Sequence, residues 1–360
     1  MNEHSSGAAP VAGACADFSA RVIAWQRTQG RHDLPWQGIR DPYRVWLSEI
    51  MLQQTQVVTA VDYYRRFLAR FPDVASLAAA PLEAVLEAWA GLGYYARARN
   101  LHRCAQAVVA RGGEFPHAPA ELAALPGIGR TTAAAIAAFA FGTRAAILDG
   151  NVKRVLARCF AIDGFPGTPR VERELWALAE ALLPETGIET YTQGLMDLGA
   201  GPCRRRQPFC PACPLYDVCQ ARLQGRQAEL PAPRPSKRLP EREASLAVVS
   251  DGAQVLLERR PAMGLWGGLL ALPEREAVQR ALAVSGVELG PGEDLPALRH
   301  TFSHFHWQLR PRLFFVSDLP PSCGESGAWV WLPWATVETA ALPTPIRRIL
   351  RDARTRWHAD

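Results

Sequence analysis

Apolar residues recur at three- and four-residue spacing through most of the first 220 positions, which is the period of amphipathic helices. The clearest helical segments are 43–58, 82–90, 131–141 and 171–182. Proline and glycine separate these segments, as expected where helices end. The pattern therefore predicts an all-α region from residue 18 to about residue 222.

The period changes to that of β-strands beyond residue 243. Short runs rich in Val, Leu, Phe and Trp are divided by turn residues, as is typical of strands. They lie at 245–250, 254–260, 309–317 and 328–334, and helical spacing returns at 275–284 and 344–351. The all-α region is therefore followed by a smaller α+β domain.

Two segments show neither the helical nor the strand pattern. Residues 225–243 combine Pro231, Pro233, Pro235 and Pro240 with basic residues, which predicts an extended, semi-rigid linker. Residues 1–16 are rich in Ser, Gly and Ala and are predicted to be disordered. We therefore expect a helical domain at 17–224, a linker at 225–243 and an α+β domain at 244–355.

Composition limits the class of protein. The 360 residues are 48% hydrophobic and carry a formal net charge of +5, which suits two folded domains and permits a nucleic-acid partner without establishing one. The N-terminus lacks the apolar core of a signal peptide, and the Ala-rich run at 132–141 is too short to span a bilayer. We expect a soluble protein of a reducing compartment, the bacterial cytoplasm and its nucleoid, without disulfides or membrane contact.

Four of the eight cysteines lie close together in the sequence. Cys203, Cys210, Cys213 and Cys219 follow the spacing C-x6-C-x2-C-x5-C. Four thiolates at such short spacing can close on one soft metal centre, and the spacing favours iron–sulfur only slightly over zinc. The arginines at 204–206 form a basic loop between the first two cysteines, which favours contact with phosphate.

The hexapeptide LPGIGR at 125–130 lies between two helical segments. Gly127 and Gly129 permit a tight turn in which backbone N–H groups approach a phosphate, next to the positive end of the following helix. An ordinary glycine-rich turn between helices is the alternative. The pattern favours a helix–hairpin–helix that contacts the DNA backbone.

Two carboxylates stand out. Glu49 lies in an otherwise apolar helical segment with Gln53 one turn later, and burial of a carboxyl there raises its pKa and suits a general acid. A solvated surface glutamate is the alternative. Asp149 precedes a helix that begins near Val152, and by itself it is best interpreted as an ordinary N-cap.

Several longer strings resemble one family. They are PWQ, WLSEIMLQQTQV, GLGYYARARNL, LPGIGR, LDGNVKRVLAR, MDLGA and the cysteine loop in the first domain, and ERRPAMGLWGGL and RHTFSHFHW in the second. Over nearly its whole length the chain resembles the MutY family of adenine DNA glycosylases. The resemblance implies a helix–hairpin–helix glycosylase fold with a [4Fe–4S] loop at 203–219 and a Nudix-like, MutT-like second domain.

The resemblance also implies a reaction. The enzyme would hydrolyse the N-glycosidic bond of adenine mispaired with 8-oxoguanine or guanine in double-stranded DNA, as a monomer, after the base leaves the duplex. Glu49 would protonate adenine at N7 and later help to activate the nucleophile, while Asp149 would stay ionised and stabilise the oxocarbenium ion. Opposite pKa environments are then expected for the two acids.

Other roles follow from the same resemblance. Leu34 and Trp36 would line the adenine pocket, although core packing explains them nearly as well. Gln53 and Tyr94 are candidates for wedging into the base stack, with core packing as the alternative for Tyr94. The remaining DNA contacts are assigned to Gly127, Gly129, Arg130, Thr131 and Asn151.

The identity of residue 131 argues against a related activity, the lyase reaction. Endonuclease III, a glycosylase with lyase activity, has a lysine nucleophile at this position, and a hydroxyl cannot form a Schiff base. We therefore expect a monofunctional enzyme, with Lys153 permitting a slow side reaction at most. An endonuclease III-like enzyme for oxidised pyrimidines and a non-catalytic DNA-binding iron–sulfur protein are the alternatives.

The second domain is predicted to bind rather than catalyse. A working Nudix hydrolase holds Mg²⁺ with a run of glutamates, and residues 277–287 contain no carboxylate. This opposes a third alternative, a nucleotide pyrophosphohydrolase. Phe302, Ser303 and His304 match the family's 8-oxoguanine loop, and the spacing of His300, His304 and His306 makes a metal site there improbable.

Overall fold

The computed structural model describes residues 11–236, 238–261, 264–284, 289–316 and 329–357. Contacts divide the chain into two compact units. The first contains Met1–Arg65, Asp73–Ala75 and Arg103–Ser236, and the second contains Arg66–Pro72, Ser76–His102 and Lys237–Asp360. The predicted boundaries near residues 225 and 243 stay predictions, because the contacts assign part of the helical segment to the second unit.

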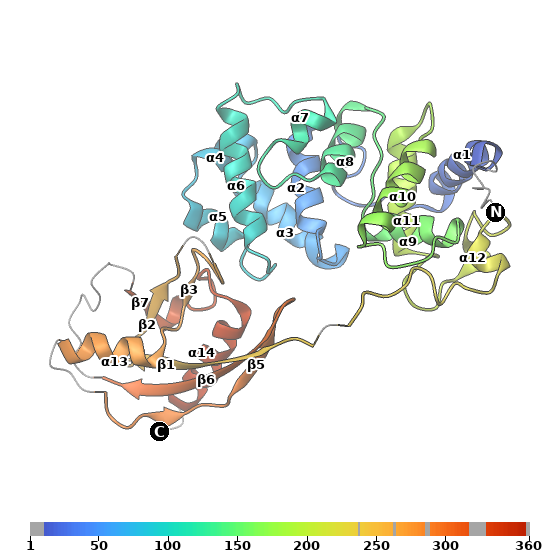
Figure 1. Cartoon of the computed structure of the whole chain (residues 1–360). Helices are drawn as coiled ribbons and strands as arrows, with labels where there is room; N and C mark the ends of the chain where they lie inside the picture. The colour runs from blue at the N-terminus through green and yellow to red at the C-terminus, as the bar shows by residue number, and fades with distance from the viewer. Residues whose placement is uncertain (1–10, 237, 262–263, 285–288, 317–328, 358–360) are drawn as a thin grey trace, which may run out of the picture. The chain divides into compact units, whose positions relative to one another are not determined.

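The region before the linker is helical in its described part, as predicted (Figure 1). The helices are α1 (Val11–Gln29), α2 (Pro42–Leu52), α3 (Val57–Arg70), α4 (Val74–Ala79), α5 (Leu82–Ala88), α6 (Ala96–Val109), α7 (Pro119–Ala123), α8 (Arg130–Phe141), α9 (Gly150–Cys159), α10 (Pro169–Ala181), α11 (Ile188–Ala200), η1 (Cys210–Ala212) and α12 (Gln220–Leu223). Helix α1 begins within the segment 1–16 that composition predicts to be disordered, and residues 1–10 lie outside the described part.

The predicted helix at 43–58 is two helices. Helix α2 starts after Asp41, whose carboxylate accepts the N–H groups of Tyr43 at 2.9 Å and Arg44 at 3.3 Å. It ends at Leu52, where the chain enters a polar run and Gln54 takes a φ of 59°. A left-handed residue cannot continue an α-helix. The break therefore turns the chain before α3 begins.

Small residues let the helices of the first unit pack closely. Helix α8 is buried along Thr132–Ala138, and most of those side chains are alanine. It packs against α2 and α7, while α9 packs against α11. A Cβ on Gly199 would lie 2.4 Å from the Cβ of Asn151, so α9 and α11 touch at a point that only glycine permits.

The second unit contains one sheet of seven described strands. They are β1 (Glu241–Ser250), β2 (Gln254–Arg259), β3 (Leu270–Ala271), β4 (Glu293–Asp294), β5 (Leu298–Thr301), β6 (His306–Phe315) and β7 (Trp329–Pro333). The order is β3-β2-β1-β6-β4, with β7 paired to β2 and β5 paired to β6. Strands β1 and β6 run parallel from Glu241↔His306 to Ser250↔Phe315, and the other pairs are antiparallel.

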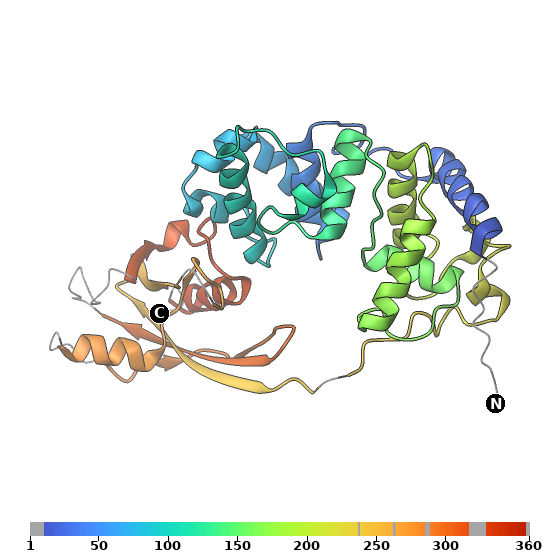
Figure 2. The same cartoon turned by 45° about the horizontal axis from the view of Figure 1, so that its top comes forward.

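Helices cover both faces of this sheet (Figures 1 and 2). Along β1, Leu246 and Val248 pack into one core with α14 (Thr344–Trp357), whereas Ala247 and Val249 pack into a second core with α13 (Arg275–Val284). Two buried faces explain why β1 is a continuous apolar run from Leu246 to Val249. The predicted class, an all-α region followed by an α+β domain, is confirmed. Among the described residues, no helix is long and apolar enough to cross a membrane.

Candidate active site and cysteine centre

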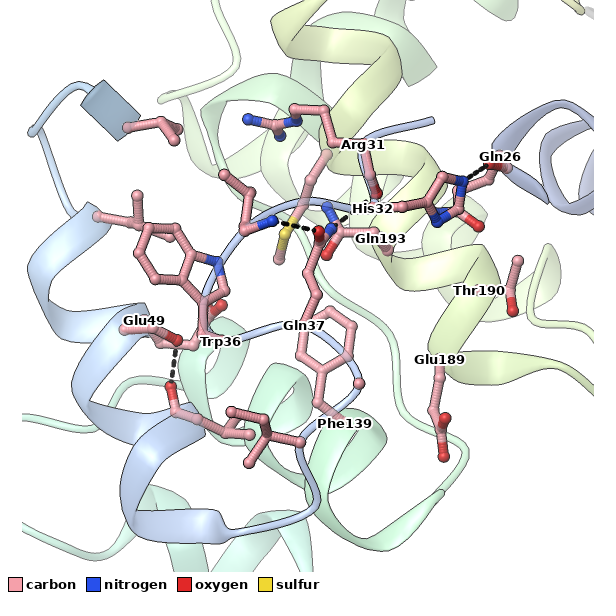
Figure 3. Close-up of a pocket in the computed structure, with 18 of the residues that line it drawn as sticks. Gln26, Arg31, His32, Trp36, Gln37, Glu49, Phe139, Glu189, Thr190 and Gln193 are labelled. Atoms are coloured by element: carbon pink, nitrogen blue, oxygen red, sulfur yellow. Dashed lines mark hydrogen bonds between the residues drawn. The ribbon is translucent and has the colours of Figure 1, made fainter. Parts of the chain in front are cut away.

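A cavity of about 330 Å³ opens in the first unit between α2, the loop that precedes it, α8 and α11 (Figure 3). This volume is within the range of small-ligand sites. Leu34 and Trp36 line it from the loop, and Glu49 lines it from α2. Its other lining residues include His32, Gln37, Arg40, Phe139, Glu189, Thr190, Gln193 and Met196.

Glu49 is the acidic group on the α2 side of the cavity. Burial raises its pKa to about 8, and the nearby charge of Asp149 adds to that rise. Val45 and Leu52 of the same helix also line the cavity. A carboxyl in this state is protonated at neutral pH and can donate its proton.

Asp149 is the N-cap of α9, and its Oδ1 accepts the N–H of Val152 at 2.8 Å. Burial raises the pKa of Asp149, whereas the N–H groups of Val152 and Asn151 and the charges of Arg154 and Lys153 lower it. The expectation of opposite shifts is therefore wrong in its simple form, because burial raises the pKa of both acids. Of the two acids, only Asp149 also receives hydrogen bonds and positive charges that favour its ionised form.

Asp149 is not among the residues that line the described cavity. The two acids are nevertheless close enough for the charge of Asp149 to raise the pKa of Glu49. Thr131 holds the segment before Asp149, because its Oγ1 accepts the N–H of Leu148 at 3.3 Å. Thus the helix after the glycine turn positions the second acid.

The glycine turn has the geometry that its sequence predicts. Gly127 has a φ of 78°, and Gly129 is the N-cap of α8. A Cβ on Gly129 would meet no atom within 4 Å, so its backbone is open on that side. The guanidinium of Arg130 lies 3.7 Å from the ring centre of Trp176 and pairs with Glu180, so α10 holds this side chain.

The two wedge candidates belong to different compact units. Gln53, at the end of α2, donates from Nε2 to Thr132 Oγ1 at 3.3 Å. Tyr94 is 56% exposed with a φ of 47°, which argues against core packing. Asn151, in the first turn of α9, accepts a hydrogen bond from Arg154 Nη2 at 2.9 Å. Their contacts with DNA stay predictions.

Cys203, Cys210, Cys213 and Cys219 line one small cavity. The buried guanidinium of Arg158 donates to Cys203 Sγ at 3.4 Å and to the carbonyls of Cys203, Arg204 and Arg205. Within the described residues, no three His, Cys, Asp or Glu side chains are grouped closely enough for a single ion. The chemistry of this donor set, four thiols beside a buried cation, fits an anionic iron–sulfur cluster.

The candidate recognition loop of the second unit joins β5 to β6. The ring of Phe302 stacks on Phe305 with centres 4.8 Å apart, and the Phe302 N–H donates to the Phe305 carbonyl at 2.9 Å. Ser303 and His304 are exposed at the tip of the loop. Phe302 therefore supports the turn, and the two polar side chains are left to contact a ligand.

Sequence reasoning missed the α11 wall of the cavity, which contains Glu189, Thr190 and Gln193 (Figure 3). One signal was present. Gln193 and Asp197 are polar residues four apart in a helix whose neighbouring positions are apolar, and such a pair shares one helix face. A buried polar pair of this kind indicates a hydrogen-bonded role.

Comparison with known proteins identifies the family. Residues 47–181 match the HhH-GPD superfamily of base excision DNA repair proteins, and residues 244–352 match the NUDIX domain. The adenine DNA glycosylase of Buchnera aphidicola (subsp. Acyrthosiphon pisum, strain APS) is 33% identical over 93% of this chain and 97% of its own length. The Homo sapiens adenine DNA glycosylase is 34% identical over 93% of this chain and 73% of its own.

One solved structure is also similar. A thermostable thymine-DNA glycosylase aligns with a TM-score of 0.53 and 30% identity, over 57% of this chain and 95% of its own. The family that the sequence motifs indicate is thereby confirmed, and so is the fold of its helical part. The chain belongs to the adenine DNA glycosylase family, within the HhH-GPD superfamily of DNA repair enzymes.

Proposed function

We propose that this protein removes adenine mispaired with 8-oxoguanine or guanine from double-stranded DNA by hydrolysing its N-glycosidic bond. The observation that carries the proposal is Glu49, a carboxyl with a pKa of about 8 that lines a cavity of about 330 Å³. Adenine leaves poorly as an anion, so the reaction needs a proton donor beside the base. The similarity to adenine DNA glycosylases supports adenine as the base.

The two acids divide the work. Glu49 gives its proton to N7 of an adenine extruded into the cavity, and then helps to activate the incoming nucleophile. Asp149 accepts the N–H of Val152 and stays ionised, so it can stabilise the cationic sugar. Its place beside the cavity, not in its lining, suits a group that faces the deoxyribose instead of the base.

The four clustered cysteines would hold a [4Fe–4S] cluster, which when bound fixes the surrounding loop. The chain's own part is to supply four thiolates, the buried cation of Arg158 and the exposed arginines at 204–206 that can contact phosphate. Cys210→Ala should lower bound iron and the visible absorbance of purified protein. Cys104→Ala, which changes a buried cysteine outside the cavity, should leave both unchanged.

The second unit would recognise the base opposite adenine. Ser303 and His304 are exposed polar groups on a loop that the stacked Phe302 and Phe305 support. Such groups can hydrogen-bond a base edge.

We propose that the enzyme acts as a monomer on the DNA of a bacterial chromosome.

Strand cleavage is not part of the proposed reaction. Thr131 cannot form a Schiff base, and the Nζ of Lys153 donates to Glu172 Oε1 at 2.6 Å. An ammonium in an ion pair is not a nucleophile. The enzyme should therefore leave an abasic site in an intact strand.

One assay tests the proposal. The protein is incubated with a duplex that carries adenine opposite 8-oxoguanine, and half of each sample is treated with hot alkali. Strand breakage only after alkali is the expected result. Breakage without alkali on a thymine glycol duplex would favour an endonuclease III-like enzyme, and no breakage on either duplex would favour DNA binding alone.

A further inference from the structure

Helices α5 and α6 of the second unit contact the turn at 264–268, which lies between β2 and β3. Arg99 of α6 donates from Nη1 to the carbonyl of Gly267 at 2.6 Å. A Cβ on Gly268, whose φ is 76°, would lie 3.3 Å from Leu86 Cδ1 of α5. The turn is therefore held by helices that are distant from it in sequence but belong to the same compact unit.

The hydroxyl of Tyr95, directly before α6, provides a second anchor. It donates to the carbonyl of Leu342 at 3.1 Å and accepts the N–H of Gly91 at 3.4 Å, and the side chain is buried. The residue immediately before it is Tyr94, the exposed wedge candidate. The segment that presents Tyr94 is thus fixed to the part of the unit that contains the sheet.

The turn also contains the residue that supports the recognition loop. Trp266 has a φ of 56°, a left-handed conformation that persists in a residue other than glycine only where neighbouring contacts impose it. The centre of its ring lies 6.0 Å from that of Phe302 and 5.0 Å from that of Trp307. Arg99 binds the carbonyl of the next residue, Gly267, so a single charged donor of α6 fixes the backbone beside this ring.

We propose that Arg99 is a positioning residue for recognition of the base opposite adenine. Through the turn that contains Trp266, it holds the loop at 302–304 in a fixed place relative to Tyr94. The inference rests on the proposed function and adds how the wedge candidate and the loop act together. Both would contact the same mispaired site, and a displacement of about 1 Å between two such groups is enough to weaken the contacts of each.

The first test compares adenine release from duplexes that carry 8-oxoguanine or guanine opposite adenine. Arg99→Met keeps a long side chain and removes the donor, so the preference for 8-oxoguanine should fall about tenfold, because hydrogen bonds from charged donors are among the stronger ones in proteins. Arg99→Lys keeps a charged donor and should recover most of the preference. Gln106→Met, at an exposed position of the same helix, should behave as wild type.

The ratio of the two rates separates positioning from stability. A general loss of packing would lower release from both duplexes by the same factor, and an unchanged preference in Arg99→Met would overturn the proposal. Should Arg99→Met not fold, as judged by thermal melting, Trp266→Gly takes its place. It removes the ring and keeps the left-handed backbone accessible, so it must lower the same preference. An unchanged preference there would overturn the proposal as well.

A double-mutant cycle tests whether Arg99 acts through the loop. Ser303→Ala combined with His304→Ala removes the polar groups of the loop. Adding Arg99→Met to this variant should lower the preference little further, because the contacts that Arg99 positions are already lost. If the two losses multiplied in full, Arg99 would act independently of the loop and the proposal would be wrong.

The outcomes also separate this inference from the proposed function. Wild-type protein that releases no adenine contradicts the proposed function. Wild-type protein that releases adenine, with a preference that is insensitive to Arg99 and Trp266, contradicts only the positioning role.

Discussion

The Glu49 cavity and the loop at 302–304 are both candidate base-binding sites, but they have different physical properties. The cavity partly encloses a carboxyl whose pKa is raised to about 8, so it can store a proton at neutral pH. The loop exposes Ser303 and His304 on an aromatic support and contains no carboxyl. We therefore expect the buried acid to mark the reacting site and the exposed polar groups to mark a site that binds without reacting.

The same contrast underlies the prediction that the second unit binds without catalysing a reaction. Its sheet and two helices match the NUDIX domain, yet residues 277–287, which include most of α13, contain no carboxylate to hold a metal. A shared fold does not by itself imply a shared activity, and the loss of hydrolase activity stays a prediction.

The largest effect is expected from removing the proton donor of the cavity. Glu49→Gln should lower the rate of adenine release about a thousandfold, because an amide cannot act as a general acid. Duplex binding should be kept, and the exposed Glu121→Gln should behave as wild type. Single-turnover kinetics with a gel-shift assay measure both quantities. Comparable turnover by the variant would refute the acid role.

Removal of the second charge should have a smaller effect. Asp149→Asn keeps a favourable N-cap for α9 but loses the negative charge, so we expect about a hundredfold loss of rate with little change in melting temperature. Asp149→Ala should lose both activity and roughly 1 kcal/mol of stability. If Asp149→Asn retained full activity, the residue would be a cap alone.

The pH dependence of the reaction tests whether Glu49 is the proton donor. Glu49 must be protonated to act, so the single-turnover rate should fall about tenfold per unit as the pH rises above about 8. The folded protein also binds this proton more tightly than the unfolded chain. Stability should therefore fall as the pH rises from about 4.5 to about 8, with Glu49→Gln losing less. A rate that stays level up to pH 10 would contradict the raised pKa.

The smallest effect is expected at the binding loop. Ser303→Ala combined with His304→Ala should lower the preference for 8-oxoguanine over guanine opposite adenine by up to about tenfold, since base-edge contacts contribute about 1–3 kcal/mol. Release from the adenine–guanine duplex should change little. Thr355→Ala, an exposed hydroxyl on α14, is the matched control. An unchanged preference would remove the loop from the recognition model.

Local patterns in the sequence identified most elements, because helical period and strand period depend on which face of each segment is buried. They predicted α5, α8, α10 and α13 closely and joined α2 to α3, because the left-handed residue Gln54 has no signature in an apolar period. Spacing and local pattern singled out the four cysteines and Glu49, and the family resemblance gave Glu49 and Asp149 their roles. Whether Asp149 acts on the sugar stays a prediction.

By itself, the sequence determined the two fold classes, the family and the chemical types of the reactive groups, since these depend on residue identity and spacing along the chain. Only the tertiary structure decided that α11 forms a wall of the cavity, that burial raises the pKa of both acids, and that Asp197 accepts hydrogen bonds from Gln193 and Arg31. The physical reason is that pKa values and hydrogen-bond partners depend on neighbours that are distant in sequence. Arg31 and Asp197 meet only when α1 and α11 pack together.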